Sequence, residues 1–228
     1  MTVLHLADEG EAADLVAFLA RLLHYDRGAA VRLQAAGTAL AVFGRPPSFE
    51  VLAIRAVRLA KPYEEGLDAL LDVTVSAGEL LEGVDETAAT AVVPAAVTGP
   101  PWAGVLPPRG GWRPEAGLPA PDALSALVGA AVAEFRRRTE ELAPEGRTRA
   151  ELDRIGREIW SRTVGTTGLP VRAVHAAQSL GFLRPAADAP RQQAAGLFSS
   201  GAWLRLRTPY GSIAVRRAGL GGLDLSVR

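Results

Sequence analysis

The spacing of hydrophobic residues changes along the first hundred positions, and each spacing predicts a different element. Between residues 8 and 23, Leu15, Phe18, Leu19 and Leu22 recur at helical intervals and predict one amphipathic helix. Runs typical of strands occupy residues 2–6, 30–36, 38–43, 49–60, 71–76 and 90–97. Ser76 and Glu79 have capping-box spacing and predict a short second helix. We therefore expect a small α+β meander domain over residues 1–98.

The second half of the sequence predicts three helices followed by a hairpin. Asp122 is the expected N-cap of a helix ending near residue 142, and Thr148 with Glu151 predicts the start of the next one. Pro170 suits the first position of a third helix, which Gly181 would end in the left-handed conformation. Residues 202–207 and 212–217 then read as two strands around a four-residue turn.

A connector without regular structure is predicted between these halves. Residues 99–114 contain five prolines, four glycines and two tryptophans. We therefore divide the chain into an acidic domain (1–98), a connector (99–120) and a basic domain (121–228), each domain with its own core. Trp102 and Trp112 either pin the connector to a domain surface or form a stacking surface for a ligand.

Charge is distributed unevenly although its total is zero. Residues 1–100 carry 7 basic and 14 acidic side chains, whereas residues 101–228 carry 18 and 11. The net charge is therefore −7 for residues 1–100 and +7 for residues 101–228. An anionic partner is therefore expected at the basic, carboxy-terminal half.

Several classes of protein are disfavoured by composition. The sequence has no cysteine, which removes disulfides and thiolate metal sites, and its three histidines lack metal-ligand spacing. No hydrolase, Walker or dinucleotide-binding motif is present, so we expect no enzyme, no cofactor and no metal. Prolines interrupt the long uncharged run at residues 87–108, and the acidic amino terminus is unlike a secretory signal. We expect a cytoplasmic protein that does not enter the membrane.

The predicted order of helix, helix, turn, helix and basic hairpin resembles the winged helix-turn-helix superfamily, and the segment from Leu169 to Leu183 resembles the recognition helix of that superfamily. The resemblance covers residues 120–217. It implies a third helix that enters the major groove of DNA and a hairpin that contacts the backbone. Helical spacing then puts Arg172, His175 and Gln178 on the outward face of that helix. A helical hairpin packed on a small sheet explains the same pattern without a ligand.

The predicted hairpin has two unlike faces. Leu204 opposite Val215 and Leu206 opposite Ile213 form an apolar face. The remaining side chains give the other face a cationic and aromatic character: Trp203, Arg205, Arg207 and Arg216. Such a face suits phosphate contact and base stacking. It equally suits an exposed cation–π pair between Trp203 and Arg216 that serves no partner.

Two hypotheses about function follow. The first is a nucleic-acid-binding or regulatory protein, with a DNA-binding basic module and an amino-terminal module that senses a ligand or forms a homodimer. The second is a non-catalytic protein that binds another protein, with the tryptophans of the connector as the contact.

Overall fold

The computed structural model describes residues 2–60, 71–184 and 195–217, and it combines helices with antiparallel sheets. The predicted α+β class is confirmed. The α-helices of the described ranges are α1 (Glu9–Tyr25), α2 (Ala77–Glu82), α3 (Pro121–Glu140), α4 (Arg149–Trp160) and α5 (Val171–Ser179). Short 3-10 helices are η1 (Pro101–Gly104) and η2 (Pro144–Gly146). The strands are β1 (Thr2–His5), β2 (Ala30–Ala36), β3 (Ala39–Gly44), β4 (Leu52–Arg58), β5 (Asp72–Ser76), β6 (Val84–Asp85), β7 (Thr90–Val93), β8 (Arg113–Glu115), β9 (Gly196–Ser200), β10 (Trp203–Thr208) and β11 (Gly211–Arg216).

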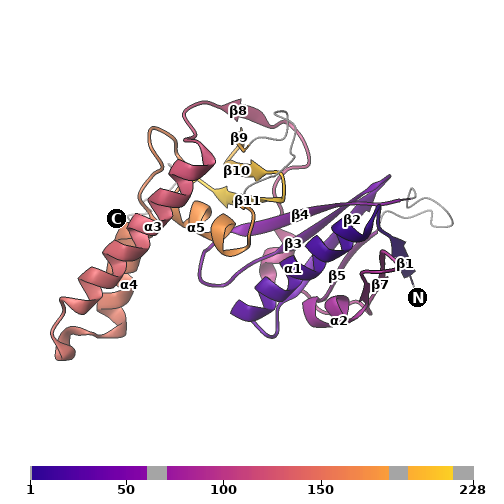
Figure 1. Cartoon of the computed structure of the whole chain (residues 1–228), viewed down its shortest axis with the longest axis horizontal. Coiled ribbons are helices and arrows are strands. Elements are labelled where there is room, and N and C mark those ends of the chain that lie inside the picture. Colours follow the sequence, from indigo (N-terminus) through magenta and orange to yellow (C-terminus); the bar gives the residue numbers. More distant parts are fainter. Residues whose placement is uncertain (1, 61–70, 185–194, 218–228) are drawn as a thin grey trace, which may run out of the picture.

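One large sheet runs through both halves of the chain (Figure 1). Its strand order is β5-β2-β3-β4-β11-β10-β9-β8, and all of its pairs are antiparallel. The β4–β11 pair joins the halves, with Ile54 opposite Ser212 and Leu52 opposite Ala214. A second, three-stranded sheet has the order β1-β7-β6. The hairpin is therefore an interior part of a continuous sheet.

The main core lies on one face of the large sheet, under the helices. Helix α1 packs against β4, and α5 packs against β11. The rings of Phe18 on α1 and Phe182 after α5 stack with centroids 5.8 Å apart, which links the two halves directly. Buried residues of both halves, including Leu15, Val42 and Leu206, belong to one cluster. The expectation that each domain has its own core is wrong, because the shared sheet gives both sets of helices the same face to cover.

Local sequence signals are largely confirmed. The Ser76 and Thr148 hydroxyls accept hydrogen bonds from the backbone N–H groups of Glu79 and Glu151, as capping boxes require. Gly181 has φ of +75°, the left-handed geometry expected after a helix. The hairpin register is also as predicted, with Leu204 opposite Val215 and Leu206 opposite Ile213.

Three local expectations are wrong. Helix α3 begins at Pro121 with Ala120 as its N-cap, so Asp122 lies inside the first turn. Strand β8 occupies part of the expected connector, where its edge position tolerates Pro114. Strand β9 lies between the third helix and the hairpin, where no element is predicted; residues 185–194 of that stretch lie outside the described residues.

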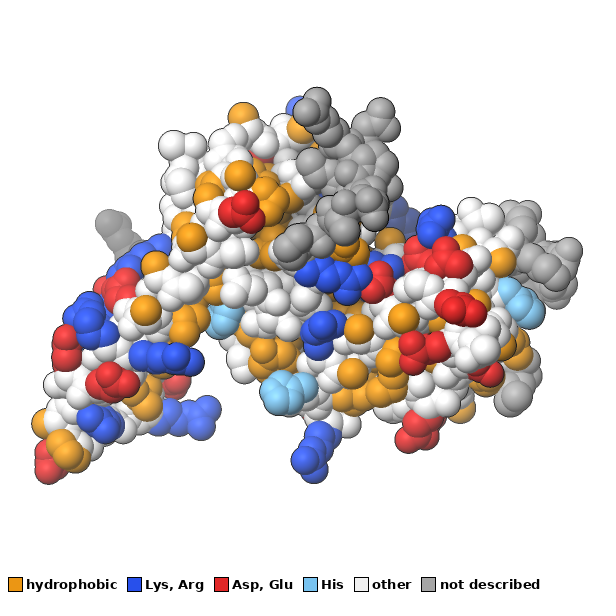
Figure 2. Space-filling model, in the orientation of Figure 1, with side chains coloured by type: hydrophobic (Ala, Val, Ile, Leu, Met, Phe, Trp, Pro, Cys, Tyr) orange, Lys and Arg blue, Asp and Glu red, His pale blue; other side chains and the backbone are white. Residues whose placement is uncertain are grey.

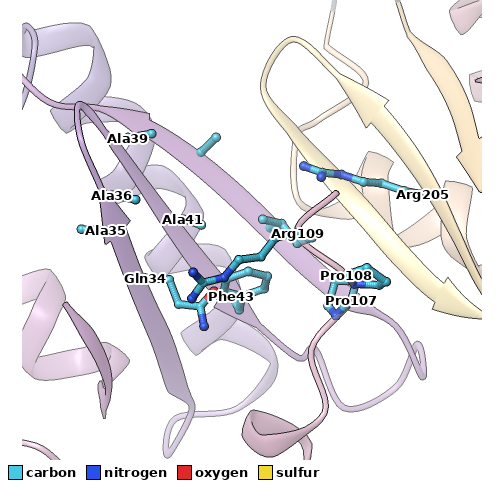
Figure 3. Close-up of a pocket in the computed structure, with 12 residues that line it drawn as sticks. Gln34, Ala35, Ala36, Ala39, Ala41, Phe43, Pro107, Pro108, Arg109 and Arg205 are labelled. Atoms are coloured by element: carbon cyan, nitrogen blue, oxygen red, sulfur yellow. The ribbon is translucent and has the colours of Figure 1, made fainter. Parts of the chain in front are cut away.

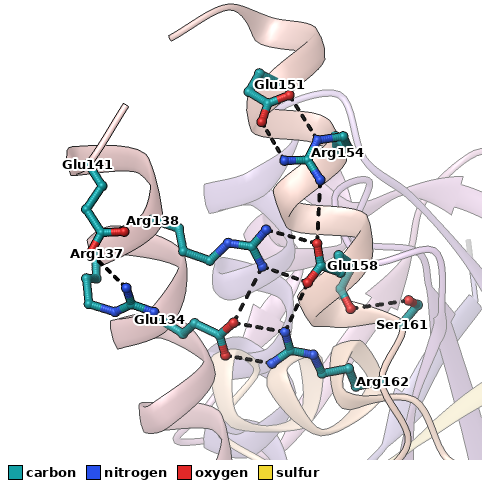
Figure 4. A network of polar contacts seen from close by, with 9 residues as sticks. All are labelled: Glu134, Arg137, Arg138, Glu141, Glu151, Arg154, Glu158, Ser161 and Arg162. Atoms are coloured by element: carbon teal, nitrogen blue, oxygen red, sulfur yellow. Dashed lines mark hydrogen bonds and ion pairs between the residues drawn. The ribbon is translucent and has the colours of Figure 1, made fainter. Parts of the chain in front are cut away.

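Helices α3 and α4 form an antiparallel arm that extends away from the sheets (Figure 1). Ion pairs cover one side of the arm (Figure 4): Arg138 pairs with Glu158 at 2.8 Å, and Arg162 pairs with Glu134 at 2.6 Å. Arginine neighbours lower the pKa of Glu158 to about 2, chiefly through the hydrogen bond from Arg138. In Figure 2 both signs of charge alternate along the arm, whereas acidic side chains gather on the opposite side, around α1 and α2. Most arginines of the arm thus form ion pairs with carboxylates of the arm itself.

Candidate functional site

The face of the large sheet opposite the helices, called the open face below, is crossed by the connector. Trp102, Leu106 and Trp112 pack there against a second apolar cluster. The buried members of this cluster come from β3, β4, β10 and β11: Phe43, Leu52, Ile54, Trp203 and Ala214. Both connector tryptophans are half-buried. They fasten the connector to the sheet, as one of the two alternatives for them predicts.

A hollow of about 430 Å³, called the tryptophan hollow, lies beside η1 on this face. Its aromatic walls are Trp102, which is half-buried, and Trp203, which is 9% exposed. Its charged lining consists of Arg45, Arg172, Arg216 and Glu50. The apolar remainder comes from the connector, β4 and β11: Val51, Leu52, Pro101, Val105, Ala214 and Val215. Three cations and two indoles therefore surround one concave volume.

The cations of this hollow are poorly neutralised. Glu50 is the one carboxylate among its described lining residues, and its carboxylate lies 3.9 Å from Nε of Arg172. This separation is too long for a hydrogen bond, and Nε of Arg172 is buried with no hydrogen-bond partner among the described residues. Arg45 and Arg216 are exposed and form no ion pair with a described carboxylate. An anion entering the hollow would meet guanidinium groups that lack strong partners.

Glu50 also has an unusual backbone. Its φ is +51°, a left-handed conformation that a residue with a long side chain rarely adopts. The conformation turns the chain between Phe49, which is buried in the main core, and Val51, which lines the tryptophan hollow. Strain of this kind is typical of segments that position functional groups.

A second, smaller hollow of about 230 Å³, called the alanine hollow, lies on the other side of the connector (Figure 3). Its floor is the open face of β2, β3 and β4, and its rim includes Pro107, Pro108 and Arg109 of the connector. Arg205 of β10 also lines this hollow (Figure 3). Burial lowers the pKa of Arg205, and the charge of Arg207 contributes in the same direction.

The predicted hairpin residues lie on the open face, but not all at one place. Trp203 and Arg216 are directly opposite in the strand register, and the Arg216 guanidinium lies 5.7 Å from the Trp203 ring centre. Arg205 is half-buried beside Trp112, at 5.7 Å. Arg207 is exposed and lies over Phe198, at 4.6 Å. Trp203 and Arg216 therefore belong to the tryptophan hollow, Arg205 belongs to the alanine hollow, and Arg207 borders neither.

The predicted outward face of the third helix is only partly present. Gln178 of α5 is exposed, and Arg172 is turned into the tryptophan hollow. His175 is half-buried: its ring stacks on Trp160 at 4.6 Å and meets Phe49 edge-on at 5.1 Å. The prediction that His175 lies on an outward, base-reading face is wrong, because Trp160 of α4 and Phe49 cover its ring. Helical spacing alone does not show which neighbour covers a face. The three side chains do not form one surface.

Three residues that line the tryptophan hollow carry no clear signal of a site in the sequence: Arg45, Glu50 and Val105. Arg45 and Glu50 belong to the turn-rich segment between β3 and β4, and Val105 follows η1 in the connector. An arginine beside two prolines at residues 46 and 47 is a weak signal for an exposed loop cation. Arg45 and Glu50 meet Arg172 through contacts between segments more than a hundred residues apart.

Two further properties concern metals and membranes. Within residues 2–60, 71–184 and 195–217, no three His, Asp or Glu side chains gather in a way that would hold a metal ion. None of the helices in these ranges combines the length and the apolar character needed to span a bilayer.

Comparison with known proteins divides the chain at the connector. A family described as a domain of unknown function, DUF8010, matches residues 1–104, and a second such domain, DUF8185, matches residues 107–220. The predicted division into two domains agrees with these matches, although the two domains share one sheet. No curated protein and no solved structure matches the chain. Because the DUF8185 match covers half of the chain, the protein belongs to the DUF8185 family.

Proposed function

We propose that this protein binds nucleic acid through its open face, taking an unpaired base into the tryptophan hollow and adjacent phosphates on its arginines. The observation that carries the proposal is the convergence of Trp102, Trp203, Arg172 and Arg216 on one hollow. Its volume of about 430 Å³ lies within the range of small-molecule sites, so a nucleotide unit fits the available space.

The aromatic part of the site supports stacking. Trp203 is held in the sheet, and Trp102 is held against the same apolar cluster by the connector. Fixed indoles lose little conformational entropy when a base stacks on them, and each stacked base contributes about 1–3 kcal/mol. The two indoles therefore favour a ligand with a planar ring over a ligand that is a flexible aliphatic chain.

The cationic part supports phosphate contact. Arg45 and Arg216 are exposed at the rim, and Arg172 lies deeper with an unpartnered Nε. Guanidinium groups bind phosphate oxygens in a bidentate manner that matches their planar fork. Three such groups on one side of a hollow favour an anionic, backbone-bearing ligand.

Single strands suit this geometry better than a duplex. Helix α5 packs against β11, α3 and α4, and Gln178 is its one exposed residue, so the helix does not present a row of side chains to a major groove. Strands β10 and β11 are flanked by β9 and β4, whereas a wing would have to project from the body. An open sheet face with aromatic side chains is instead a common platform for unpaired bases. We therefore propose that the protein stacks unpaired bases and does not read base edges in a major groove. The cytoplasm remains the expected compartment.

The test is fluorescence anisotropy of a fluorescein-labelled oligothymidine with the full chain over a series of salt concentrations. Three phosphate contacts predict a slope of about −2 for log K against log salt, because each contact on a single strand contributes about −0.7. The double change Arg45→Gln with Arg216→Gln should lower the slope by about 1.4. Trp102→Ala should weaken binding about 5- to 150-fold at unchanged slope.

Arg149→Gln is the matched control, because the Arg149 side chain on α4 is 95% exposed and does not line the hollow. It should bind like the unaltered chain. Absence of salt-dependent binding to any single strand at low ionic strength would overturn the proposal. Tighter binding to a duplex of the same sequence would overturn the single-strand mode.

A protein partner is the second candidate, and one observation favours it. Val105 is 50% exposed at the edge of the tryptophan hollow, next to the half-buried Trp102. Exposed apolar side chains beside an aromatic wall suit an apolar segment of another protein or of a second copy. Binding of such a partner would depend little on salt, which separates it from nucleic acid in the same titration.

A further inference from the structure

The floor of the alanine hollow is unusual for the solvent side of a sheet. Ala36, Ala39 and Ala56 are exposed, and Ala41 between them is half-buried. Sheets that expose one face normally carry polar side chains at these alternating positions. Methyl groups instead leave a low, flat and apolar shelf across β2, β3 and β4.

The rim of the same hollow is cationic. Arg109 of the connector lies over the floor near Gln34 and Phe43, and Arg205 extends toward the hollow from β10 (Figure 3). Neither lies within ion-pair distance of a described carboxylate, although the charge of Arg109 contributes to the lowered pKa of Asp72. Nε of Arg205 is buried without a hydrogen-bond partner among the described residues. The nearby carboxylate of Asp72 already accepts hydrogen bonds from Arg32 and Gln34.

Size limits what the hollow accepts. Its volume of about 230 Å³ is below the range of roughly 300–1,000 Å³ that drug-sized ligands occupy. A flat floor favours a planar molecule, and alanine methyl groups favour an apolar one. The two guanidinium groups require a negative charge at the edge of that molecule.

We infer that the alanine hollow is a second ligand site, which binds a small, planar, apolar molecule carrying one carboxylate. The carboxylate accepts hydrogen bonds from Arg205 and Arg109, and the ring lies on the alanine shelf. The Gln34 amide lies at the edge of the same floor (Figure 3). The floor belongs to the DUF8010 half and the rim to the DUF8185 half, so a bound ligand contacts both. The site is separate from the tryptophan hollow and does not depend on nucleic acid binding.

The test uses 2-naphthoate as the probe and isothermal titration of the full chain. We expect binding with one molecule per chain, and binding of neutral 2-naphthamide at least about tenfold weaker, because hydrogen bonds to charged groups contribute about 1.5–3 kcal/mol. Arg205→Gln should weaken 2-naphthoate binding by a similar factor. Ala56→Phe should abolish it by filling the shelf, because Ala56 lines the hollow at an exposed position. Circular dichroism and the thermal midpoint of each variant confirm that it folds.

Arg113→Gln on β8 is the control, because Arg113 is an exposed cation that does not line the hollow. It should bind 2-naphthoate like the unaltered chain. Absence of binding at millimolar probe, or equal affinity for the amide, would overturn the inference. Loss of naphthoate binding in Trp102→Ala but not in Ala56→Phe would also overturn it, since the probe would then occupy the tryptophan hollow. Ala56→Phe should retain oligothymidine binding, so the two proposals fail independently.

Discussion

Arg55 on β4 and Glu11 on α1 form a buried ion pair in which Nη2 of Arg55 donates to the Glu11 carboxylate at 2.8 Å. Their side chains are 6% and 10% exposed. Nη1 of Arg55 donates to the carbonyl of Tyr210 in the β10–β11 turn, also at 2.8 Å. One guanidinium therefore ties a helix and a strand of the first half to the hairpin of the second.

Replacing Arg55 with methionine should destabilise the whole chain. The change leaves the Glu11 charge and the Tyr210 carbonyl buried without this donor, and losing one partner of a buried pair costs about 3–5 kcal/mol. Arg58 still donates to Glu11 at 2.8 Å, so the lower end of that range is expected. Urea unfolding followed by circular dichroism measures the loss, with Arg149→Met on the arm as control. A loss no larger than in the control would contradict this account of the pair.

Gly211 should not tolerate a side chain. A Cβ atom at this position would lie 2.5 Å from the Phe182 ring, which is buried in the main core. Gly211→Ala is therefore expected to lower the free energy of unfolding by about 1–3 kcal/mol. In the double variant Gly211→Ala with Phe182→Leu, the smaller leucine side chain leaves room for the new Cβ atom. This variant should recover part of the lost stability.

Gly129→Ala is the matched control for this substitution. Its Cβ would meet nothing within 4 Å in the middle of α3, so it should stabilise the chain by about 0.5–1 kcal/mol. Both variants are measured by the same chemical unfolding. Equal effects of the two substitutions would show that the Phe182 contact does not limit this position.

Stability should fall on mild acidification because of His175. Burial between Trp160 and Phe49 lowers the pKa of His175 below its ordinary value of 6.5. Below pH 6.5 the unfolded chain binds the proton more readily than the folded chain, so the stability declines with pH until the folded pKa is passed. His175→Phe should remove this part of the decline. Thermal midpoints compared between pH 8 and pH 5 test it, and an equally steep decline in the variant would contradict the assignment.

Removing the charge of Glu50 should strengthen oligonucleotide binding. Glu50 is 73% exposed and lies 3.9 Å from Arg172, so it competes weakly with an incoming phosphate. Exposed pairs contribute about 0.2–1 kcal/mol, which predicts up to about fivefold tighter binding for Glu50→Gln. Stability should change little, because glutamine keeps the same backbone conformation. Unaltered affinity would show that Arg172 does not contact phosphate.

The local structure of this protein is determined by short-range sequence signals. Capping boxes at Ser76 and Thr148 set the starts of α2 and α4, and the turn between Thr208 and Gly211 sets the hairpin register. These signals act between residues a few positions apart, where backbone geometry and side-chain hydrogen bonds decide the outcome. The pairing of Trp203 with Arg216 was predictable for the same reason.

The arrangement of the site was decided only by tertiary structure. The pairing of β4 with β11 joins residues about 160 positions apart, and no local signal specifies which strand edge meets which. That pairing turned an expected wing into the middle of a sheet, and it brought Arg45 and Glu50 beside Arg172 and Arg216. Helical spacing likewise predicted which side His175 occupies, but not that Trp160 covers it. Periodicity defines the faces of an element, whereas the packing of other elements decides which of those faces remain open to a ligand.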